Sequence, residues 1–437
     1  MPADRPAALQ SLADWLAYLE RIHPFAIDMG LDRVSAVRER MGLAPGFPII
    51  TVGGTNGKGS VCAMLEAILS SAGYRVGLYS SPHLLRYNER VRVARREVSD
   101  DALTQAFGRV EQAREPQSLT YFEFGTLAAM DIFIFEKVDV AVLEVGLGGR
   151  LDAVNVFDAD CTVVTTVDFD HMDYLGPDRE SIGREKAGIF RAGVPAVCGD
   201  EDPPLALSGH AAAIAAPLVL RGRDYGYKVS RGDWQYWSAQ GKRSALPHPA
   251  LRGAYQLANG ATALAALEQL KDRLPVDMGA IRRGFVEVDL PGRFQVMPGR
   301  PMVILDVGHN PHAARGLSES LRALPAGGRT IAVFAMLKDK DIAGVAQPVK
   351  DQIDEWMVAS LPGLRGADVP SIEQALASIG VSAPVGRFDS PAAAYQCAIR
   401  SAGQNDKILV FGSFFTVGAA LQARMSPLPV RAIHRPA

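Results

Sequence analysis

A glycine-rich segment between an apolar run and a helical pattern carries the residues best suited to chemistry. The apolar residues 49–52 lead into GGTNGKGS at 53–60, and apolar side chains then recur at helical spacing up to Gly73. A strand, a glycine loop and a helix together point backbone N–H groups and the helix N-terminus at a phosphate. Lys58 adds a charge for the outer phosphates, and the Ser60 hydroxyl suits Mg²⁺. The segment therefore predicts ATP binding.

The spacing of this segment differs from the usual phosphate-binding loop. That loop has Ser or Thr directly after the lysine, whereas here Gly59 intervenes, and Val52 occupies the position of an earlier glycine. A flexible turn before a helix is the alternative interpretation. The flanking strand and helix patterns favour the phosphate-binding one.

Polar side chains also follow three further apolar runs, where we expect strands to end. They are Ser81 after 75–79, Glu144 after 138–143, and Asp168, Asp170, His171 and Asp173 after 162–167. In an open parallel sheet, ligands bind outside the carboxyl ends of the strands, so these groups should meet the Lys58 loop at one edge. Mg²⁺ prefers oxygen ligands and takes one or two carboxylates plus phosphate. We therefore expect Ser60, Ser81, Glu144 and His171 beside a triphosphate.

Each of these side chains also has a purely structural interpretation. Glu144 taken alone is equally consistent with an acid that braces a loop or caps a helix. For His171 alone, a loop histidine satisfied by its neighbours is the better explanation, and the nearby acids can cap the next helix. Lys186 lies in a short helical pattern and, from composition alone, is a solvated surface charge.

The composition bounds the class of protein. The chain has 437 residues, 48% of them hydrophobic and 22% charged, with a formal net charge of −2, as expected of a soluble globular enzyme with two or three domains. The absence of a basic surplus argues against nucleic acid, and no run is long or apolar enough to span a membrane. The first residues do not resemble a secretory signal. Four scattered cysteines argue against zinc and disulfides, so we expect a cytoplasmic protein.

Strand-like and helix-like segments alternate along the chain, which predicts an α/β fold. Residues 1–296 should form a large ATPase domain with a parallel sheet of the phosphate-loop type, interrupted by a small antiparallel excursion at 225–237. Residues 297–437 should form a smaller Rossmann-like α/β domain. There Asp306 and His309 follow the apolar run 303–305. A ribose or adenine contact for Asp306 and a phosphate contact for His309 are as consistent with this pattern as a capping acid and a loop histidine.

Seven segments together resemble the bifunctional bacterial folylpolyglutamate synthase/dihydrofolate synthase family of the Mur ligase superfamily. They occur in the family's order and are 27–31 (IDMGL), 51–60 (TVGGTNGKGS), 79–84 (YSSPHL), 144–155 (EVGLGGRLDAVN), 170–176 (DHMDYLG), 306–311 (DVGHNP) and 411–414 (FGSF). The inserted Gly59 is the form that this family has. The resemblance covers nearly the whole chain and implies an ATP-dependent ligase that joins a carboxylate to the amine of L-glutamate.

The resemblance also implies a set of nucleotide and metal contacts. Nucleotide contacts fall on Thr55, Asn56, Gly57, Lys58, Gly59 and Ser60, and then on Asn259, Arg293, Asp306 and His309. Magnesium ligands fall on Ser60, Ser81, Glu144 and His171, and a carbamylated lysine falls on Lys186. Carbamylation turns a cation into a carboxylate-like ligand, which explains a lysine beside a cation site. Lys58, Glu144, His171 and Lys186 are thus the expected catalytic residues, with two Mg²⁺ ions.

The pterin site that the resemblance implies lies in three separate segments. They are Ile27, Asp28 and Met29; Thr120, Tyr121, Phe122 and Glu123; and Leu151, Asp152 and Ala153. Phe122 offers a stacking face, and Asp152 can pair with the amino and ring N–H groups of a pterin. The local pattern leaves open that Phe122 is an ordinary core aromatic.

The implied reaction converts a carboxylate into an acyl phosphate with ATP, after which the glutamate amine displaces phosphate. The substrates are dihydropteroate, giving dihydrofolate, or reduced folates, giving folylpolyglutamates; we expect a monomer. The alternative is a Mur-type amino-acid ligase of peptidoglycan synthesis, although the phosphate loop begins too early for that enzyme's additional N-terminal domain. A phosphate-loop GTPase requires the ordinary spacing and a guanine-reading segment, and the chain has neither.

Overall fold

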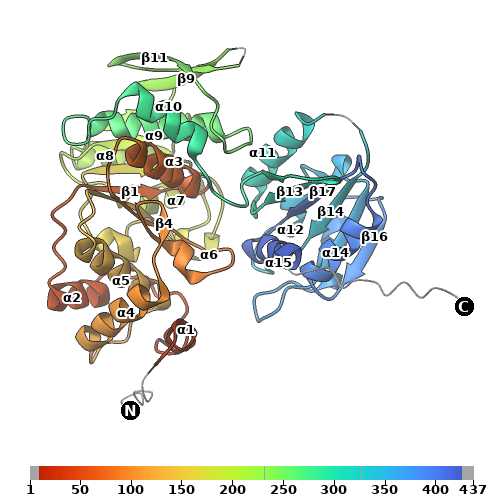
Figure 1. The fold of residues 1–437 in the computed structure, drawn as a ribbon, viewed down its shortest axis with the longest axis horizontal. Coiled ribbons are helices and arrows are strands. Elements are labelled where there is room, and N and C mark those ends of the chain that lie inside the picture. Colours follow the sequence, from red (N-terminus) through yellow and green to blue (C-terminus); the bar gives the residue numbers. More distant parts are fainter. Residues whose placement is uncertain (1–8, 231, 326, 426–437) are drawn as a thin grey trace, which may run out of the picture. The chain divides into compact units, whose positions relative to one another are not determined.

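The computed structural model describes residues 9–230, 232–325 and 327–425. The chain divides into two compact units (Figure 1). One comprises Met1–Leu251 and Tyr255–Leu290, and the other comprises Arg252–Ala254 and Pro291–Ala437. No helix within the described ranges has both the length and the apolar character needed to cross a membrane.

The first unit is built on an eight-stranded sheet in the order β4-β3-β2-β5-β1-β6-β7-β8. Its strands are β1 (Ile49–Gly53), β2 (Val76–Tyr79), β3 (Val91–Val93), β4 (Arg96–Glu97), β5 (Val140–Glu144), β6 (Cys161–Val164), β7 (Ala196–Cys198) and β8 (Leu218–Leu220). The six strands from β2 to β8 in this order are parallel, whereas β3 and β4 form an antiparallel edge. Strands β1, β2, β5, β6 and β7 are buried along their whole length, as expected for a parallel sheet covered on both faces.

Alternate residues of the central strands enter two different hydrophobic cores. Ile49 belongs to one core and Ile50 to the other, and in β5 Ala141 and Val142 divide in the same way. Side chains on a strand point to opposite faces in turn, so each face needs its own helical layer. The helices are α1 (Leu12–Leu19), α2 (Asp32–Met41), α4 (Asp100–Arg114), α5 (Tyr121–Phe135), α6 (Met172–Leu175), α7 (Arg179–Ala187) and α8 (Leu205–Ala213) with the first core, and α3 (Lys58–Ser71), α9 (Gln256–Gln269) and α10 (Met278–Glu287) with the second.

The predicted antiparallel excursion is a three-stranded sheet. It consists of β9 (Tyr225–Val229), β10 (Trp234–Ser238) and β11 (Gly241–Leu246) in the order β11-β10-β9. Tyr236 joins it to α9 by a 2.8 Å hydrogen bond from its hydroxyl to Glu268 Oε2. Trp234 packs edge-on against Phe285 of α10, so this sheet belongs to the second core.

The second unit contains a six-stranded sheet in the order β12-β13-β17-β14-β15-β16. Its strands are β12 (Gln295–Met297), β13 (Met302–Asp306), β14 (Thr330–Phe334), β15 (Glu355–Ala359), β16 (Val385–Phe388) and β17 (Lys407–Phe411). Only the β12–β13 pair is antiparallel among the described strands of this sheet. The helices are α11 (Pro311–Arg322), α12 (Ile342–Ala346), α13 (Val369–Ser378), α14 (Pro391–Ser401) and α15 (Phe414–Met425).

The predicted α/β class is confirmed, with two differences, of which the first bears on the candidate site. Strand β6 ends at Val164 instead of Val167, because residues 165–167 leave the sheet, and Thr165 and Thr166 bond the phosphate loop. The second difference is that the edge strands β3, β4, β12 and β16 carry no strong sequence pattern and were not predicted. The ends of the central parallel strands, where the candidate side chains lie, agree with prediction to within one or two residues for β1, β2, β5 and β13.

Candidate active site

The phosphate loop joins the end of β1 to the first turn of α3. Gly54 and Gly57 have φ values of 140° and 87°, and Gly57 is the N-cap of the helix. A Cβ on Gly57 would lie 2.6 Å from Asn259 Oδ1, so Asn259 of α9 packs directly on the loop. Lys58 Nζ donates hydrogen bonds to the carbonyls of Gly54 (3.0 Å) and Thr55 (3.1 Å). The lysine side chain therefore folds back over its own loop.

The segment after β6 holds this loop in place. Thr55 N donates to Thr166 O (2.7 Å), and Asn56 N donates to Thr166 Oγ1 (3.1 Å). Thr165 Oγ1 donates to Asn56 O (2.6 Å), and Thr55 Oγ1 bonds both N and O of Asp168 at 3.0 Å. Sequence reasoning missed the role of Thr165 and Thr166. Two hydroxyls directly after an apolar run, opposite a glycine loop, were the available signal.

The structure brings Glu144 and Ser81 together beside β1. Glu144 is the last residue of β5 and is paired in register with Val52, and Leu143 is paired with Tyr79 at the end of β2. Ser81 N donates to Glu144 Oε2 at 3.2 Å. Glu144 is only 4% exposed, and Ser60 in the first turn of α3 is 2% exposed. A buried carboxylate and two hydroxyls therefore lie at neighbouring strand and helix ends, as the strand-end rule predicts.

Lys186 is buried on α7, with 4% of its surface exposed, so its interpretation as a solvated surface charge is wrong. Burial lowers the pKa of Lys186 to about 7, and the charge of Lys58 lowers it further, while Asp170 and Asp152 act in the opposite direction. Desolvation disfavours an ammonium ion, which explains the dominant effect. A far larger fraction of this amine is therefore neutral near pH 7 than of a surface lysine, whose pKa is about 10.4.

His171 follows Asp170 and is the N-cap of α6. Its backbone is left-handed (φ 52°), and its N–H donates to Asp170 Oδ1 at 2.9 Å. Left-handed backbone is uncommon outside glycine and asparagine, and this conformation sets the direction in which the imidazole leaves the loop. His171 is half-buried, with its Nε2 3.8 Å from Asp170 Oδ1.

The three predicted pterin segments converge on the loop after β5. A Cβ on Gly146 would lie 2.7 Å from the Phe122 ring, and one on Gly148 would lie 3.4 Å from Met29 Cε. Asp152 accepts hydrogen bonds from Leu147 N (2.8 Å) and Val154 N (3.1 Å). Burial raises the pKa of Asp152 to about 7, partly offset by these N–H groups. Asp152 therefore braces the loop as well as being a candidate for ligand contact.

Phe122 is half-buried, and its ring lies 5.7 Å from that of Tyr79, so it is only partly a core aromatic. Arg33 was not predicted. It ties two of the segments together, with nitrogens 2.7 Å from Asp28 Oδ2 and 3.2 Å from Glu123 Oε1. Thr120 and Glu123 form a capping box at the start of α5. Of the remaining predicted contacts, Tyr121 packs edge-on against Tyr87, Ala153 is buried, and Ile27 and Leu151 are half-buried.

The second unit groups three predicted nucleotide contacts. Asp306 is the last residue of β13 and accepts hydrogen bonds from Phe294 N (2.9 Å) and Gly308 N (2.7 Å). Arg293 lies over the Phe414 ring at 5.0 Å, and the His309 ring lies 6.2 Å from the same phenylalanine. Burial raises the pKa of Asp306, against the effect of the two N–H groups and the charge of Arg293.

The oxygen donors of the first unit have the chemistry that a divalent cation requires. Ser60, Ser81 and Glu144 offer oxygen donors of the kind that Mg²⁺ binds. Within the part of the chain that the structure describes, no group of three or more His, Cys, Asp or Glu side chains is placed to hold a metal ion. Ser60, Ser81 and Glu144 lie next to the glycine loop. They therefore fit a cation that takes its remaining ligands from a phosphate.

Two family models match most of the chain. Residues 52–267 match the Mur ligase middle domain, and residues 292–414 match the Mur ligase glutamate ligase domain. The dihydrofolate synthase/folylpolyglutamate synthase of Escherichia coli (strain K12) is 49% identical over 418 residues, which cover 95% of this chain and 96% of that protein.

Solved structures give the same result in three dimensions. A structure described as E. coli FolC in complex with DHPP and ADP superposes with a TM-score of 0.91 at 48% identity, covering 96% of this chain and 100% of the other. A bifunctional folylpolyglutamate synthase/dihydrofolate synthase with Mn, AMPPNP and L-glutamate bound has a TM-score of 0.89 at 46% identity, covering 96% of this chain and 99% of the other.

Proposed function

This chain belongs to the dihydrofolate synthase/folylpolyglutamate synthase family, and from that premise we infer that it is an ATP-dependent ligase of folate metabolism. It adds L-glutamate to dihydropteroate, giving dihydrofolate, and to reduced folates, giving folylpolyglutamates. The observation that carries this conclusion is the 49% identity over 95% of the chain to a dihydrofolate synthase/folylpolyglutamate synthase. The peptidoglycan alternative is not favoured, because the similar full-length proteins are folate enzymes.

We propose that ATP and divalent cations bind at the ends of β1, β2 and β5. Similar structures hold AMPPNP and Mn, and the glycine loop and oxygen donors of this chain fit the same groups. Thr55 to Ser60 and Asn259 hold the phosphates, and Arg293, Asp306 and His309 provide the remaining nucleotide contacts. Ser60, Ser81, Glu144, His171 and Lys186 hold two Mg²⁺ ions. When bound, the cations neutralise phosphate charge and align the reacting groups.

A carbamate on Lys186 is part of this proposal. The neutral amine nitrogen adds to the carbon of CO₂ and releases one proton, which leaves an anionic carbamate in place of an ammonium ion. Burial and the nearby Lys58 charge support this step because both lower the pKa of the Lys186 amine, to about 7, which raises the fraction of neutral amine. The resulting oxygens serve as a carboxylate-like ligand.

The pterin is proposed to bind among residues 27–29, 120–123 and 151–153. Phe122 supplies a stacking face, and the lone pairs of Asp152 not used by backbone N–H groups accept from the pterin. A carboxylate is a poor acyl donor, so the substrate acid must first become an acyl phosphate. Lys58 stabilises the charge that moves during that transfer, and the glutamate amine then displaces phosphate.

We further propose that the enzyme acts as a monomer in the cytoplasm. All four cysteines are free thiols, three of them buried, as is usual in a reducing compartment. Size-exclusion chromatography with light scattering tests the first point.

Mass spectrometry of products tests the function directly. The purified chain is incubated with ATP, Mg²⁺, L-glutamate and either dihydropteroate or tetrahydrofolate. Addition of one glutamate to dihydropteroate and of one or more to tetrahydrofolate, with equivalent ADP, is the expected result. Product from only one acceptor would restrict the function to one synthase, and no glutamate addition to either would refute it.

A further inference from the structure

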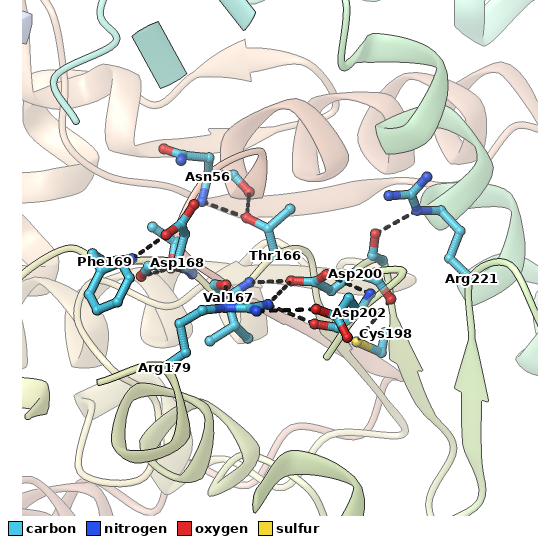
Figure 2. A network of polar contacts seen from close by, with 12 residues as sticks. Asn56, Thr166, Val167, Asp168, Phe169, Arg179, Cys198, Asp200, Asp202 and Arg221 are labelled. Carbon is cyan, nitrogen blue, oxygen red and sulfur yellow. Dashed lines mark hydrogen bonds and ion pairs between the residues drawn. The ribbon is translucent and has the colours of Figure 1, made fainter. Parts of the chain in front are cut away.

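Arg179 and Asp200 form a network of polar contacts around the backbone of Val167 (Figure 2). Val167 lies between Thr166 and Asp168, which bond the phosphate loop. Val167 N donates to Asp200 Oδ2 at 2.9 Å, and Arg179 Nε donates to Val167 O at 3.0 Å. Both backbone groups of one buried residue are thus satisfied by side chains from other elements. Arg179 begins α7, and Asp200 follows β7.

The network is itself held on both sides. The Arg179 guanidinium donates to Asp202 O at 2.6 Å and lies 3.6 Å from Asp200 Oδ2. Asp202 N donates to Asp200 Oδ1 at 3.0 Å, which fixes the second carboxylate oxygen. Arg221 secures the start of the same loop by donating to Gly199 O at 2.6 Å (Figure 2). The planar guanidinium of Arg179 donates to several acceptors at once, a geometry that the ammonium of a lysine does not reproduce.

The residues next to Val167 make the contacts that matter for the nucleotide. Thr166 on one side bonds the backbone of Thr55 and Asn56, and Asp168 on the other bonds the Thr55 hydroxyl. A shift of Val167 would therefore move both clamping residues at once. None of Arg179, Asp200 or Val167 belongs to the proposed nucleotide or metal contacts.

We propose that Arg179 and Asp200 are positioning residues that set the phosphate loop through Val167, and so determine nucleotide affinity without touching the nucleotide. The inference rests on the proposed function. This role differs from a general stabilising one. Loss of Arg179 or Asp200 should disturb Thr55 and Asn56, which residues 166 and 168 contact, and should leave the pterin segments unchanged.

Enzyme kinetics and titration calorimetry with ADP on the full chain test this proposal. Asp200→Ala and Arg179→Ala should each raise the KM for ATP and weaken ADP binding by about tenfold, with the KM for dihydropteroate unchanged. Asp200→Asn keeps an oxygen that accepts from Val167 N and should restore binding to within about threefold of wild type. The double variant should lose little more than either single one, because both act on one residue.

Asp202→Ala is the matched control. Its side chain is 95% exposed and makes only a 3.4 Å ion pair with Arg179, so ATP kinetics should stay as in wild type. If Asp202→Ala is as damaging as Asp200→Ala, or if Arg179→Ala and Asp200→Ala lower the melting temperature without changing the KM for ATP, the proposal is wrong.

Hydrogen exchange without nucleotide provides a measurement independent of activity. In Asp200→Ala, amides in the peptide that contains Thr55 and Asn56 should exchange faster than in wild type. If Asp200→Ala does not fold, Arg179→Lys is measured in its place, with the same expected result. Unchanged exchange in a folded variant would overturn the proposal. If the wild-type chain itself neither binds ADP nor turns over, the proposed function fails, while the exchange result still decides whether the pair controls the loop.

Discussion

At the residue scale, Lys58 and Lys186 have environments that suit different tasks. Lys58 is held over its own loop by two backbone carbonyls and remains partly exposed. Lys186 is buried, and its pKa of about 7 follows from desolvation and from the charge of Lys58. One lysine therefore presents a fixed positive charge, and the other presents an amine that loses its proton readily.

Replacement of Lys58 by alanine should abolish turnover with little loss of stability. Within the described part of the chain, the Lys58 ammonium donates its hydrogen bonds to its own loop, so the fold depends little on it. Removal of one preorganised charge, by contrast, typically costs about a hundredfold or more in rate. ADP release and the melting temperature check both parts. Normal turnover by Lys58→Ala would refute its assigned role.

Replacement of Lys186 by alanine should reduce turnover deeply, and short-chain carboxylic acids should restore part of it. The substitution leaves space for a carboxylate near the position of the proposed carbamate. Lys186→Arg, which stays charged and does not form this carbamate, is the comparison and should gain nothing from added acid. Wild-type rates for Lys186→Ala without added acid would exclude the carbamate.

At the scale of elements, the phosphate loop and the end of β6 are fitted to each other. A Cβ on Gly54 would lie 1.9 Å from Thr165 Oγ1 and 2.9 Å from Thr165 N. The close approach is what allows Thr165 Oγ1 to reach Asn56 O. The loop shape is therefore set by the segment that follows β6, about 110 residues further along the chain, as much as by the loop's own glycines.

Gly54→Ala should destabilise the protein by about 2–4 kcal/mol, from overpacking added to backbone strain at positive φ. ADP affinity should fall with it. Gly73→Ala is the control, since Gly73 also has positive φ (98°) but has no atoms within 4 Å of the new Cβ; it should cost about 1 kcal/mol and leave ADP binding intact. Urea unfolding and calorimetry measure both effects. Equal losses in the two variants would show that packing against Thr165 is unimportant.

At the scale of the whole molecule, each of the two units carries proposed nucleotide contacts of its own. Lys58 and Asn259 belong to the first, whereas Arg293, Asp306 and His309 belong to the second. In the second unit, Phe414 at the start of α15 provides the surface against which Arg293 and His309 pack. That unit therefore contributes to the proposed reaction with residues of its own.

Arg293→Ala should raise the KM for ATP by about tenfold while the melting temperature changes little, because the side chain is partly exposed. Arg424→Ala is the comparison within the same unit. Arg424 is exposed and donates to Pro298 O at 3.0 Å, so its removal should leave ATP kinetics unchanged. An unaltered KM for ATP in Arg293→Ala would remove this residue from the nucleotide site.

The sequence by itself determined what is local: the strand, glycine loop and helix around Lys58, and the polar residues that end β2, β5 and β13. Such features follow from backbone preferences and side-chain periodicity, which act over a few residues. Strand order, by contrast, depends on contacts between distant segments. Only the tertiary structure could bury Lys186, bring Thr165 and Thr166 onto the loop, and join residues 27–29, 120–123 and 151–153 through Arg33 and the loop after β5. Burial and long-range hydrogen bonding, which set those environments, are properties of the packed chain, and no local pattern specifies which distant segments meet.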